Sequence, residues 1–578
     1  MDTVNIKING KDYTVPAGIT VLEAAKMANI DIPTLCYLKD INEIGACRMC
    51  LVEVKGARGL VTSCVYPVNE GMEVFTNTPK IQSVRKMNLE LILSNHDKKC
   101  LSCIRSTDCE LQKLCRDYGV DSTHFSGTVN EYPLDTSSTS IVRDNNKCIL
   151  CRRCVAACQK QQGVGVIGTN DRGFDTHIGC AFETTLANTS CINCGQCIVA
   201  CPVGALYERD DTQKVLDAIA DPEKHVAICT APSVRATLGE CFGYEVGTDV
   251  EGKMVAALKA LGFDGVYDMN LTADLTIMEE AHELIERIQN GGKLPMITSC
   301  SPGWIKFCEH YFPEMTENLS TCKSPQQMFG ALYKTYYAQK MGLDPKNIVF
   351  VSAIPCTAKK FEVQRDGQNA AGVPDVDIAI TTRELGRLIS KAGIDFKNLA
   401  DEKFDQPFDF GSGAGAIFGA TGGVMEAALR TAAEVILNKP LKKLDFVEVR
   451  GTEGIKRATY KLGDLELKVA VCSGTANAKE LLTRVQNGEE NVQFIEVMAC
   501  PGGCVNGGGQ PTQPASVRNN VDLRAKRAAV LYQDDIDCDV RKSHENSAVK
   551  RLYDEFFETP GSHKAHEILH THYVKRGL

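Results

Sequence analysis

Two stretches decide how the first third of this sequence is read: CILCRRCVAAC at residues 148–158 and CINCGQCIVACP at residues 191–202. In each stretch the cysteines are separated by two, two and three residues, and the second stretch ends in Cys-Pro. This spacing is typical of the two-cluster bacterial ferredoxins, in which the fourth cysteine of each block ligates the other block's cluster. Structural zinc needs no such crossed quartets, so two 4Fe–4S clusters are the favoured interpretation. The expected ligands are Cys148, Cys151, Cys154 and Cys201 for one cluster, and Cys191, Cys194, Cys197 and Cys158 for the other.

The composition favours metal binding over disulfide formation. The chain has 578 residues, and 27 of them, about 5%, are cysteine. Hydrophobic residues at 43% and charged residues at 24% are globular values, which exclude a disordered or fibrous protein. The net charge of −9 does not indicate nucleic-acid binding, and neither a signal peptide nor a run of about 18 apolar residues is present. We therefore expect a cytoplasmic protein, bound to neither membrane nor nucleic acid, whose reduced thiols hold metal.

A second cysteine set lies nearer the N-terminus. It follows VNIKINGKDYTV at residues 4–15, which reads as two alternating strands around an Asn-Gly turn, and a helix expected from about Thr20. This order is typical of a β-grasp ferredoxin. A cysteine loop with one distant cysteine then favours a 2Fe–2S cluster, with zinc as the alternative. The ligands would be Cys36, Cys47, Cys50 and Cys64.

A third set combines one imidazole with three thiolates. Its members are His96, Cys100, Cys103 and Cys109. The spacing alone suits zinc and a 4Fe–4S cluster almost equally. Several redox clusters in one chain are best explained by an electron wire, with electrons entering at one end and used at the other.

The rest of the chain, from about Asp211, reads as conventional α/β structure. Short apolar runs such as HVAICTAPSV (225–234), LPMITSC (294–300) and NIVFVSAIPC (347–356) each reach a Cys or Pro turn. Amphipathic helices lie between them, among them LTIMEEAHELIERIQN (275–290), which Gly291 and Gly292 should end. Alternating strands and helices predict parallel sheets, whose sites gather at the carboxyl ends of the strands. The cysteines at those ends are therefore placed for chemistry.

Three further segments carry a family resemblance. TSCSPGW (298–304), IPCTAKKFE (354–362) and EVMACPGGCVNGGGQP (496–511) resemble the three signature segments of the iron-only (FeFe) hydrogenases. RKSHEN (541–546) and AHEILHTHY (565–573) are similar to that family's C-terminal belt. The resemblance implies the reaction 2H⁺ + 2e⁻ ⇌ H₂ and makes the His96 set a 4Fe–4S site. The implied cofactors are one 2Fe–2S cluster, three accessory 4Fe–4S clusters and the H-cluster, a 4Fe–4S cubane joined to a diiron unit that carries CO, cyanide and a dithiolate.

The expected fold is a multidomain α+β and α/β chain. A β-grasp 2Fe–2S domain would span residues 1–80, a small His/Cys3 cluster domain 81–125, and a two-cluster ferredoxin domain 140–210. A large two-lobed α/β catalytic domain with a C-terminal belt would span 211–578.

The resemblance also implies roles for residues around the H-cluster. Cys356, Cys500 and Cys504 would ligate the cubane, and Cys504 would also bridge it to the diiron unit. The glycines around Cys500 and Cys504 would let the backbone approach a bulky group. Lys359 would place its ammonium against a cyanide ligand, although without the motif a solvated surface lysine is the default. The pocket wall would be formed by Pro232, Ser233, Gln326, Met498, Phe418 and Ile354, the last at a position where the family usually has Met.

One position departs from the family pattern. The family usually reads TSCCP, with a proton-carrying first cysteine and a ligating second cysteine, whereas this chain has Cys300 followed by Ser301. Three accounts are open. Ser301 ligates through oxygen, which suits iron–sulfur chemistry less well than sulfur; Cys300 shifts to become the ligand; or the cluster is labile.

A proton route is implied as well. The helix expected around Met278 has an apolar arc and, beside it, one stripe formed by Glu280, Glu283 and Arg287. Without the resemblance, this stripe would be interpreted as a solvated charged face. The family's matching groups relay protons. The expected order, from outside inward, is Arg287, Glu283, Ser320, Glu280 and Cys300.

The expected function is a reversible hydrogenase that exchanges electrons with ferredoxin or with flavin-dependent, NAD(P)-linked diaphorase subunits. Separate maturation proteins would build the diiron unit. The alternative is a hydrogenase-like H₂ sensor or an electron-transfer subunit, with turnover impaired because Ser301 replaces the usual cysteine.

Overall fold

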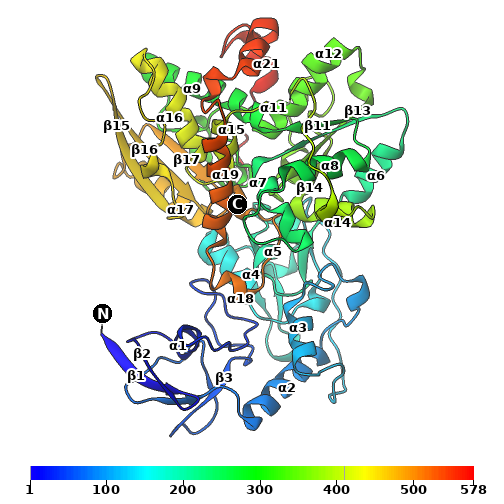
Figure 1. The fold of residues 1–578 in the computed structure, drawn as a ribbon, viewed down its shortest axis with the longest axis vertical. Coiled ribbons are helices and arrows are strands. Elements are labelled where there is room, and N and C mark those ends of the chain that lie inside the picture. The colour runs from blue at the N-terminus through cyan, green and yellow to red at the C-terminus, as the bar shows by residue number, and fades with distance from the viewer. Residues whose placement is uncertain (1, 409, 578) are drawn as a thin grey trace.

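The computed structural model describes residues 2–408 and 410–577. Figure 1 shows two tiers: the N-terminal modules, blue to cyan, lie below a larger α/β body, green to red. The fold is therefore mixed α/β. Within the residues described, no helix is both long and apolar enough to cross a membrane.

The N-terminal module is a five-stranded sheet in the order β2-β1-β5-β3-β4. Its strands are β1 (Thr3–Ile8), β2 (Lys11–Pro16), β3 (Leu51–Val54), β4 (Val61–Thr62) and β5 (Glu73–Phe75). The predicted hairpin is present, and its turn places Asn9 and Gly10 at φ of 50° and 84°. The predicted helix is α1 (Val21–Met27), which begins after Thr20 because Thr20 and Glu23 form a reciprocal capping box.

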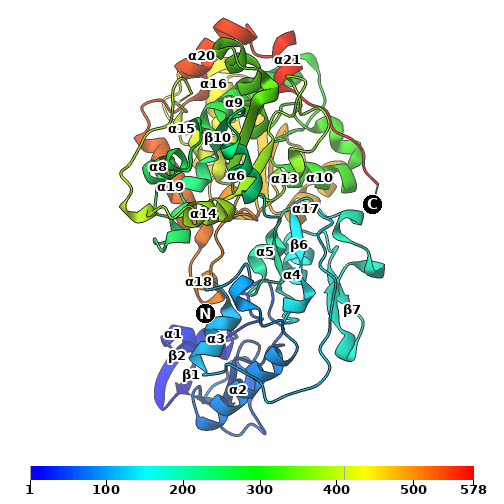
Figure 2. The same ribbon diagram turned by 90° about the vertical axis from the view of Figure 1, so that its right-hand side faces the viewer.

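Helix α2 (Pro79–Ser94) leads to a small loop-rich module that ends in α3 (Glu110–Asp117). The ferredoxin module follows, with paired strands β6 (Ile141–Arg143) and β9 (Leu206–Glu208) and the short helices α4 (Arg153–Ala156) and α5 (Gln196–Ala200). Between its cysteine blocks, β7 (Gly168–Asn170) and β8 (His177–Gly179) form a hairpin on the outer flank, seen in Figure 2.

The larger body contains two four-stranded sheets. The first is all parallel, in the order β11-β10-β13-β14, and the second has the order β12-β17-β16-β15. The first consists of β10 (His225–Thr230), β11 (Gly265–Asp268), β13 (Ile348–Ile354) and β14 (Ile378–Thr381). The second consists of β12 (Met296–Ile297), β15 (Ile455–Leu462), β16 (Leu465–Ser473) and β17 (Phe494–Met498), with only β15 antiparallel to its neighbour.

Helix α9 (Asn270–Asn290) packs against α11 (Pro325–Leu332) and α16 (Gly423–Leu437). It ends at Gly291, as the sequence predicts, because Gly291 adopts a left-handed conformation with φ of 74°. The C-terminal segment runs from α18 (Ala515–Arg518), beside the lower tier, along α19 (Leu523–Asp537) and α20 (Ser547–Leu552) to α21 (His563–Leu569) at the top of Figure 1. One chain segment therefore links both tiers.

Candidate functional site

The ferredoxin module encloses two hollows of similar size. They hold about 430 and 440 Å³ of empty space, and both are lined by Ile167 and Leu206. One is lined by Cys148, Cys151, Cys154 and Cys201, and the other by Cys158, Cys191, Cys194 and Cys197. Burial raises the pKa of all eight thiols, so holding them together as thiolates requires bound cations. The structure thus brings together the two crossed quartets, and the donor sets fit iron–sulfur clusters.

The N-terminal set Cys36, Cys47, Cys50 and Cys64 also converges. The Sγ atoms of Cys50 and Cys64 lie 3.2 Å apart, and the backbone N–H of Cys47 donates to Cys36 Sγ at 3.5 Å. In the other set, His96 has a buried Nδ1 with no partner among the described residues, and burial lowers its pKa, which favours the neutral imidazole that binds metals. This set lies against the ferredoxin module, because a Cβ on Gly204 would be 2.6 Å from Cys103 Sγ.

The catalytic candidate is a cavity between the carboxyl ends of the two sheets. Segments that follow five strands line it: β10, β11 and β13 of the first sheet, and β12 and β17 of the second. The space among its lining residues, including the part open to solvent, is about 740 Å³. Its lining includes Pro232, Ser233, Cys300, Ser301, Gln326, Ile354, Cys356, Lys359, Phe418, Met498, Cys500 and Cys504. Residues far apart in the chain thus share one small space.

Two features of this cavity fit a bulky inorganic group. A Cβ on Gly503 would lie 2.7 Å from the backbone N of Thr421, and a Cβ on Gly507 would lie 2.3 Å from the carbonyl O of Pro355. Only glycine lets these loops pack so closely around the cysteines. The hydroxyl of Ser233 is buried and has no hydrogen-bond partner among the described residues, which leaves it free for a polar ligand atom.

Lys359 is buried, so the alternative of a solvated surface lysine is wrong. Its Nζ donates to the carbonyl O of Cys300 at 3.2 Å and to Glu362 Oε2 at 2.8 Å. The same carboxylate oxygen accepts from Ser324 Oγ at 2.9 Å and from Gln326 Nε2 at 3.1 Å. Glu362 therefore fixes two side chains of the cavity wall. Our sequence reasoning missed it, although it stands in the quoted segment three residues after Lys359, within reach on one helical turn.

Cys300 and Ser301 have different surroundings. The hydroxyl of Ser301 accepts the backbone N–H of Ala499 at 3.2 Å, next to Cys500 at the end of β17. Cys300 is partly buried, and the pKa of its thiol is raised first by desolvation and then by the nearby Glu280 carboxylate. Ser301 is therefore bonded beside Cys500, and Cys300 lies near the carboxylate of Glu280 on α9.

The predicted proton route is hydrogen-bonded in its outer half. Arg287 Nη2 donates to Glu283 Oε1 at 2.5 Å, and Ser320 Oγ donates to Glu283 Oε2 at 2.9 Å. Glu280 is fully buried, which shows that the interpretation of this stripe as a solvated face is wrong. Its carboxylate makes no hydrogen bond within 3.5 Å to any described residue, so the expected continuous chain is interrupted between Ser320 and Cys300.

The environment of Glu280 suits proton transfer near neutral pH. Burial, and secondly the charge of Glu283, raise its pKa to about 8; Ser299 N–H and the Ser320 hydroxyl lie near enough to offset part of this rise. A group with such a pKa both accepts and donates protons under physiological conditions.

The ferredoxin module abuts the cavity directly. Gln196 Nε2 donates to the carbonyl O of Asn506 at 2.9 Å, and Thr357 Oγ1 donates to the carbonyl O of Asn193 at 2.7 Å. A Cβ on Gly508 would be 2.2 Å from the carbonyl O of Cys194. The loop that carries one predicted cluster thus touches the loops that carry Cys356 and Cys504. Together, the cluster sites and the adjoining cysteine-lined cavity define the class: an iron–sulfur oxidoreductase.

Comparisons with known proteins agree with this class. Residues 224–508 match the model "Iron only hydrogenase large subunit, C-terminal domain", and residues 521–576 match "Iron hydrogenase small subunit". Residues 1–79 match a 2Fe-2S iron-sulfur cluster binding domain, 85–124 the NADH-ubiquinone oxidoreductase-G iron-sulfur binding region, and 138–207 the ferredoxin-like domain of NADH-quinone oxidoreductase subunit 3.

Full-length relatives extend the likeness. The chain is 49% identical to the NADP-reducing hydrogenase subunit HndD of Solidesulfovibrio fructosivorans, with all of both chains covered. It is 45% identical to iron hydrogenase 1 of Clostridium pasteurianum, over 99% of this chain and all of that one. A solved variant of the apo [FeFe]-hydrogenase HydA1 from Chlamydomonas reinhardtii is 40% identical with a TM-score of 0.57, covering 64% of this chain and all of that one.

The chain therefore belongs to the iron-only (FeFe) hydrogenase family. The predictions of a hydrogenase with N-terminal iron–sulfur domains for electron relay, and of an H-cluster-type catalytic domain, are confirmed. The sensor and electron-transfer alternatives are not favoured.

Proposed function

We propose that the reaction 2H⁺ + 2e⁻ ⇌ H₂ takes place in the cavity between the two sheets. Cys356, Cys500 and Cys504 would hold the cubane of an H-cluster, with Ser301 at the fourth ligand position. The bound H-cluster would supply the redox and metal chemistry. The convergence of these residues from three strand ends, directly beside a ferredoxin-type cysteine quartet, is the observation that supports this most strongly.

The chain's own residues would bind and orient this group. The ammonium of Lys359, held by Glu362, would contact a negatively charged cyanide ligand, and the unpaired hydroxyl of Ser233 would donate to another polar ligand atom. Four apolar residues of the wall would exclude water from the reacting side: Pro232, Ile354, Phe418 and Met498. Ser352 would orient Gln326, because its hydroxyl donates to Gln326 Oε1 at 2.7 Å. These contacts fix a group that the backbone alone could not orient.

Proton delivery would end at the thiol of Cys300. Arg287, Glu283 and Ser320 would pass the proton inward along their hydrogen bonds. Glu280 would carry it across the remaining gap, through a bridging water or a change of rotamer. Because Cys300 lies beside Glu280 while Ser301 is bonded at the end of β17, we assign the proton step to Cys300 and the ligand position to Ser301.

Electron delivery would use the modules of the lower tier. These modules would hold one 2Fe–2S cluster and three accessory 4Fe–4S clusters, in domains at residues 1–80, 81–125 and 140–210. The catalytic domain would span residues 211–578. Both the His96 set and the 2Fe–2S set would pass electrons to the ferredoxin module, whose Cys194 loop contacts the catalytic loops.

The partners follow from the relatives. HndD is named as a subunit of an NADP-reducing hydrogenase, so we propose that this chain works in a larger complex with flavin-dependent, NAD(P)-linked subunits and exchanges electrons with ferredoxin. Maturation proteins would build the diiron unit. A cytoplasmic location remains a prediction from the sequence.

The proposal is tested by reconstituting the iron–sulfur clusters, adding the diiron unit during maturation, and recording infrared spectra and H₂ evolution anaerobically. We expect CO and cyanide bands together with turnover from reduced methyl viologen. Bands without turnover would support the sensor alternative, and absence of the bands after successful cluster reconstitution would refute the assigned cavity.

A further inference from the structure

Asn42 joins two cluster sites that lie in different modules. Its side-chain Nδ2 donates to the carbonyl O of Cys36 at 2.7 Å and to the carbonyl O of Cys151 at 3.0 Å. Cys36 belongs to the 2Fe–2S set, and Cys151 belongs to the first ferredoxin quartet. One amide nitrogen therefore uses both of its hydrogens to connect a residue of each set.

The loop around Asn42 is built to hold this amide in place. Asn42 is only 3% exposed, and its backbone N–H and carbonyl both bond to Leu38, which forms an isolated β-bridge. Asp40 takes a φ of 62° in the turn between them. Leu38 is also buried, against Ala157 and Ala200 of the ferredoxin module. A donor fixed by its own loop loses little entropy when it bonds.

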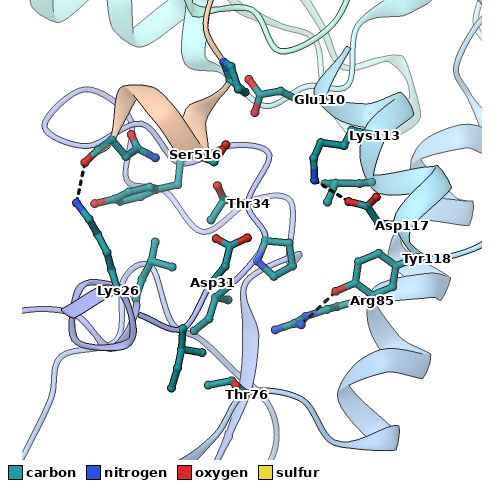
Figure 3. A pocket seen from close by; sticks show the side chains of 18 of the residues that line it. Lys26, Asp31, Thr34, Thr76, Arg85, Glu110, Lys113, Asp117, Tyr118 and Ser516 are labelled. Carbon is teal, nitrogen blue, oxygen red and sulfur yellow. Dashed lines mark hydrogen bonds and ion pairs between the residues drawn. The ribbon is translucent and has the colours of Figure 1, made fainter. Parts of the chain in front are cut away.

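A cleft separates part of the 2Fe–2S module from α3 and from the segment around Asn519. Figure 3 shows this cleft, with Lys26, Asp31 and Thr34 on the wall of the 2Fe–2S module and Lys113 and Asp117 on α3. Across it, Lys26 Nζ donates to the carbonyl O of Asn519 at 3.2 Å, and Lys39 N donates to Asn519 Oδ1 at 3.0 Å. These two contacts dock the module without touching a residue of either cysteine set.

We infer that Asn42 is a positioning residue for electron transfer between the 2Fe–2S site and the first ferredoxin site. It fixes the spacing of the two sites and supplies a hydrogen-bonded path between their ligand residues. This inference rests on the proposed cluster assignment, and it gives the side chain a role beyond docking. Groups that support metal ligands typically change activity by roughly 10–100-fold when replaced.

The test compares Asn42→Leu with Asn519→Ala in the full-length, cluster-loaded protein. Asn42→Leu removes both bridging donors and keeps a side chain of similar volume. Asn519→Ala removes the docking contact that Asn519 makes with Lys39, in the loop that carries Asn42. Reduction of each cluster after mixing with H₂ is followed by freeze-quench EPR. We expect Asn42→Leu to slow reduction of the 2Fe–2S cluster roughly tenfold, with the 4Fe–4S signals rising at the wild-type rate, and Asn519→Ala to leave all rates unchanged.

Either of two results would overturn the inference: wild-type 2Fe–2S kinetics in Asn42→Leu, or an equal slowing in Asn519→Ala, which would reduce Asn42 to docking. A second readout needs no H₂. In dithionite-reduced samples the magnetic coupling between the 2Fe–2S cluster and its neighbour should weaken in Asn42→Leu; unchanged coupling contradicts the inference.

If Asn42→Leu loses the 2Fe–2S signal, Asn42→Ala replaces it, because alanine removes both donors without placing a charge against the two carbonyl oxygens. Failure of the underlying proposal is recognised separately. It would appear in the wild type as a missing 2Fe–2S spectrum, or as clusters that dithionite reduces and H₂ does not.

Discussion

The ferredoxin module and the catalytic cavity hold cysteines in opposite ways. In the module, short sequence spacings place three thiols of each block around one hollow, and the fourth comes from the sister block further along the same small module. In the cavity, Cys300, Cys356 and Cys500 come from three different strand ends in two sheets. The first site is encoded locally, whereas the second exists only when both sheets have folded and met.

This difference has physical consequences. A local site can bind its metal as the loop forms, so ligand identity should matter more than the surrounding fold. The assembled site depends on long-range contacts, such as those of Glu362 and of the close-packed glycines at 503 and 507. Substitutions that do not touch a ligand should therefore harm the cavity much more than the module.

The largest expected effect concerns the crossing of the two quartets. Cys158→Ala should eliminate the cluster nearer the cavity and spare the other, while Cys201→Ala should do the reverse, because each fourth cysteine lines the sister block's hollow. Mössbauer and EPR spectra of the two variants would distinguish the clusters. Loss of the same cluster in both variants would contradict the crossed pairing.

The second effect concerns proton transfer. Glu280→Gln should lower H₂ evolution by roughly 10²–10⁴-fold, because the amide cannot relay a proton, and cluster spectra should stay intact. Glu286→Gln is the matched control, since Glu286 lies on the same helix outside the proposed route and should leave turnover unchanged. Undiminished H₂ evolution in Glu280→Gln would exclude the proposed route.

The third effect concerns a residue that ligates nothing. Glu362→Gln should lower turnover roughly tenfold, because it weakens the acceptor shared by Lys359, Ser324 and Gln326. The cyanide bands in infrared spectra should also shift. A variant with unchanged turnover and unchanged bands would show that the cavity wall does not need this carboxylate.

A further prediction addresses Ser301. Ser301→Cys should slow the loss of catalytic iron to a chelator by roughly tenfold, because thiolate is the softer ligand for iron–sulfur clusters. Iron release is measured by absorbance in the matured protein. Equal release from both proteins would mean that position 301 does not ligate the cubane.

The last prediction concerns stability and pH. The pKa of Glu280 is raised to about 8 in the folded protein, so its contribution to stability is complete below the unfolded value near 4.5 and is lost as pH rises toward 8. Glu280→Gln should remove this loss. Relative to the wild type, the variant should gain roughly 1 kcal/mol per pH unit in that window, measured by denaturant unfolding. A constant difference across this range would refute the raised pKa.

The features that the sequence predicts correctly are the local ones, and those that it does not predict depend on contacts between distant segments. Local rules of turns, caps and spacing predict three features: the hairpin around Asn9, the end of α9 at Gly291 and the grouping of cysteines in the ferredoxin module. The pocket residues needed the family resemblance, because nothing near Phe418 or Gln326 in the chain shows that they share a cavity. Glu362 and Asn42 were missed since their roles depend on contacts with distant residues, and the gap beside Glu280 depends on packing that no local pattern encodes.

We propose that the assembled cavity holds an active H-cluster although Ser301 stands at the fourth ligand position. The most direct test is anaerobic H₂ evolution with reduced methyl viologen, measured on the same matured sample whose infrared spectrum is recorded. We expect CO and cyanide bands together with sustained turnover. Bands with no turnover, or fully loaded accessory clusters with no bands, would contradict it.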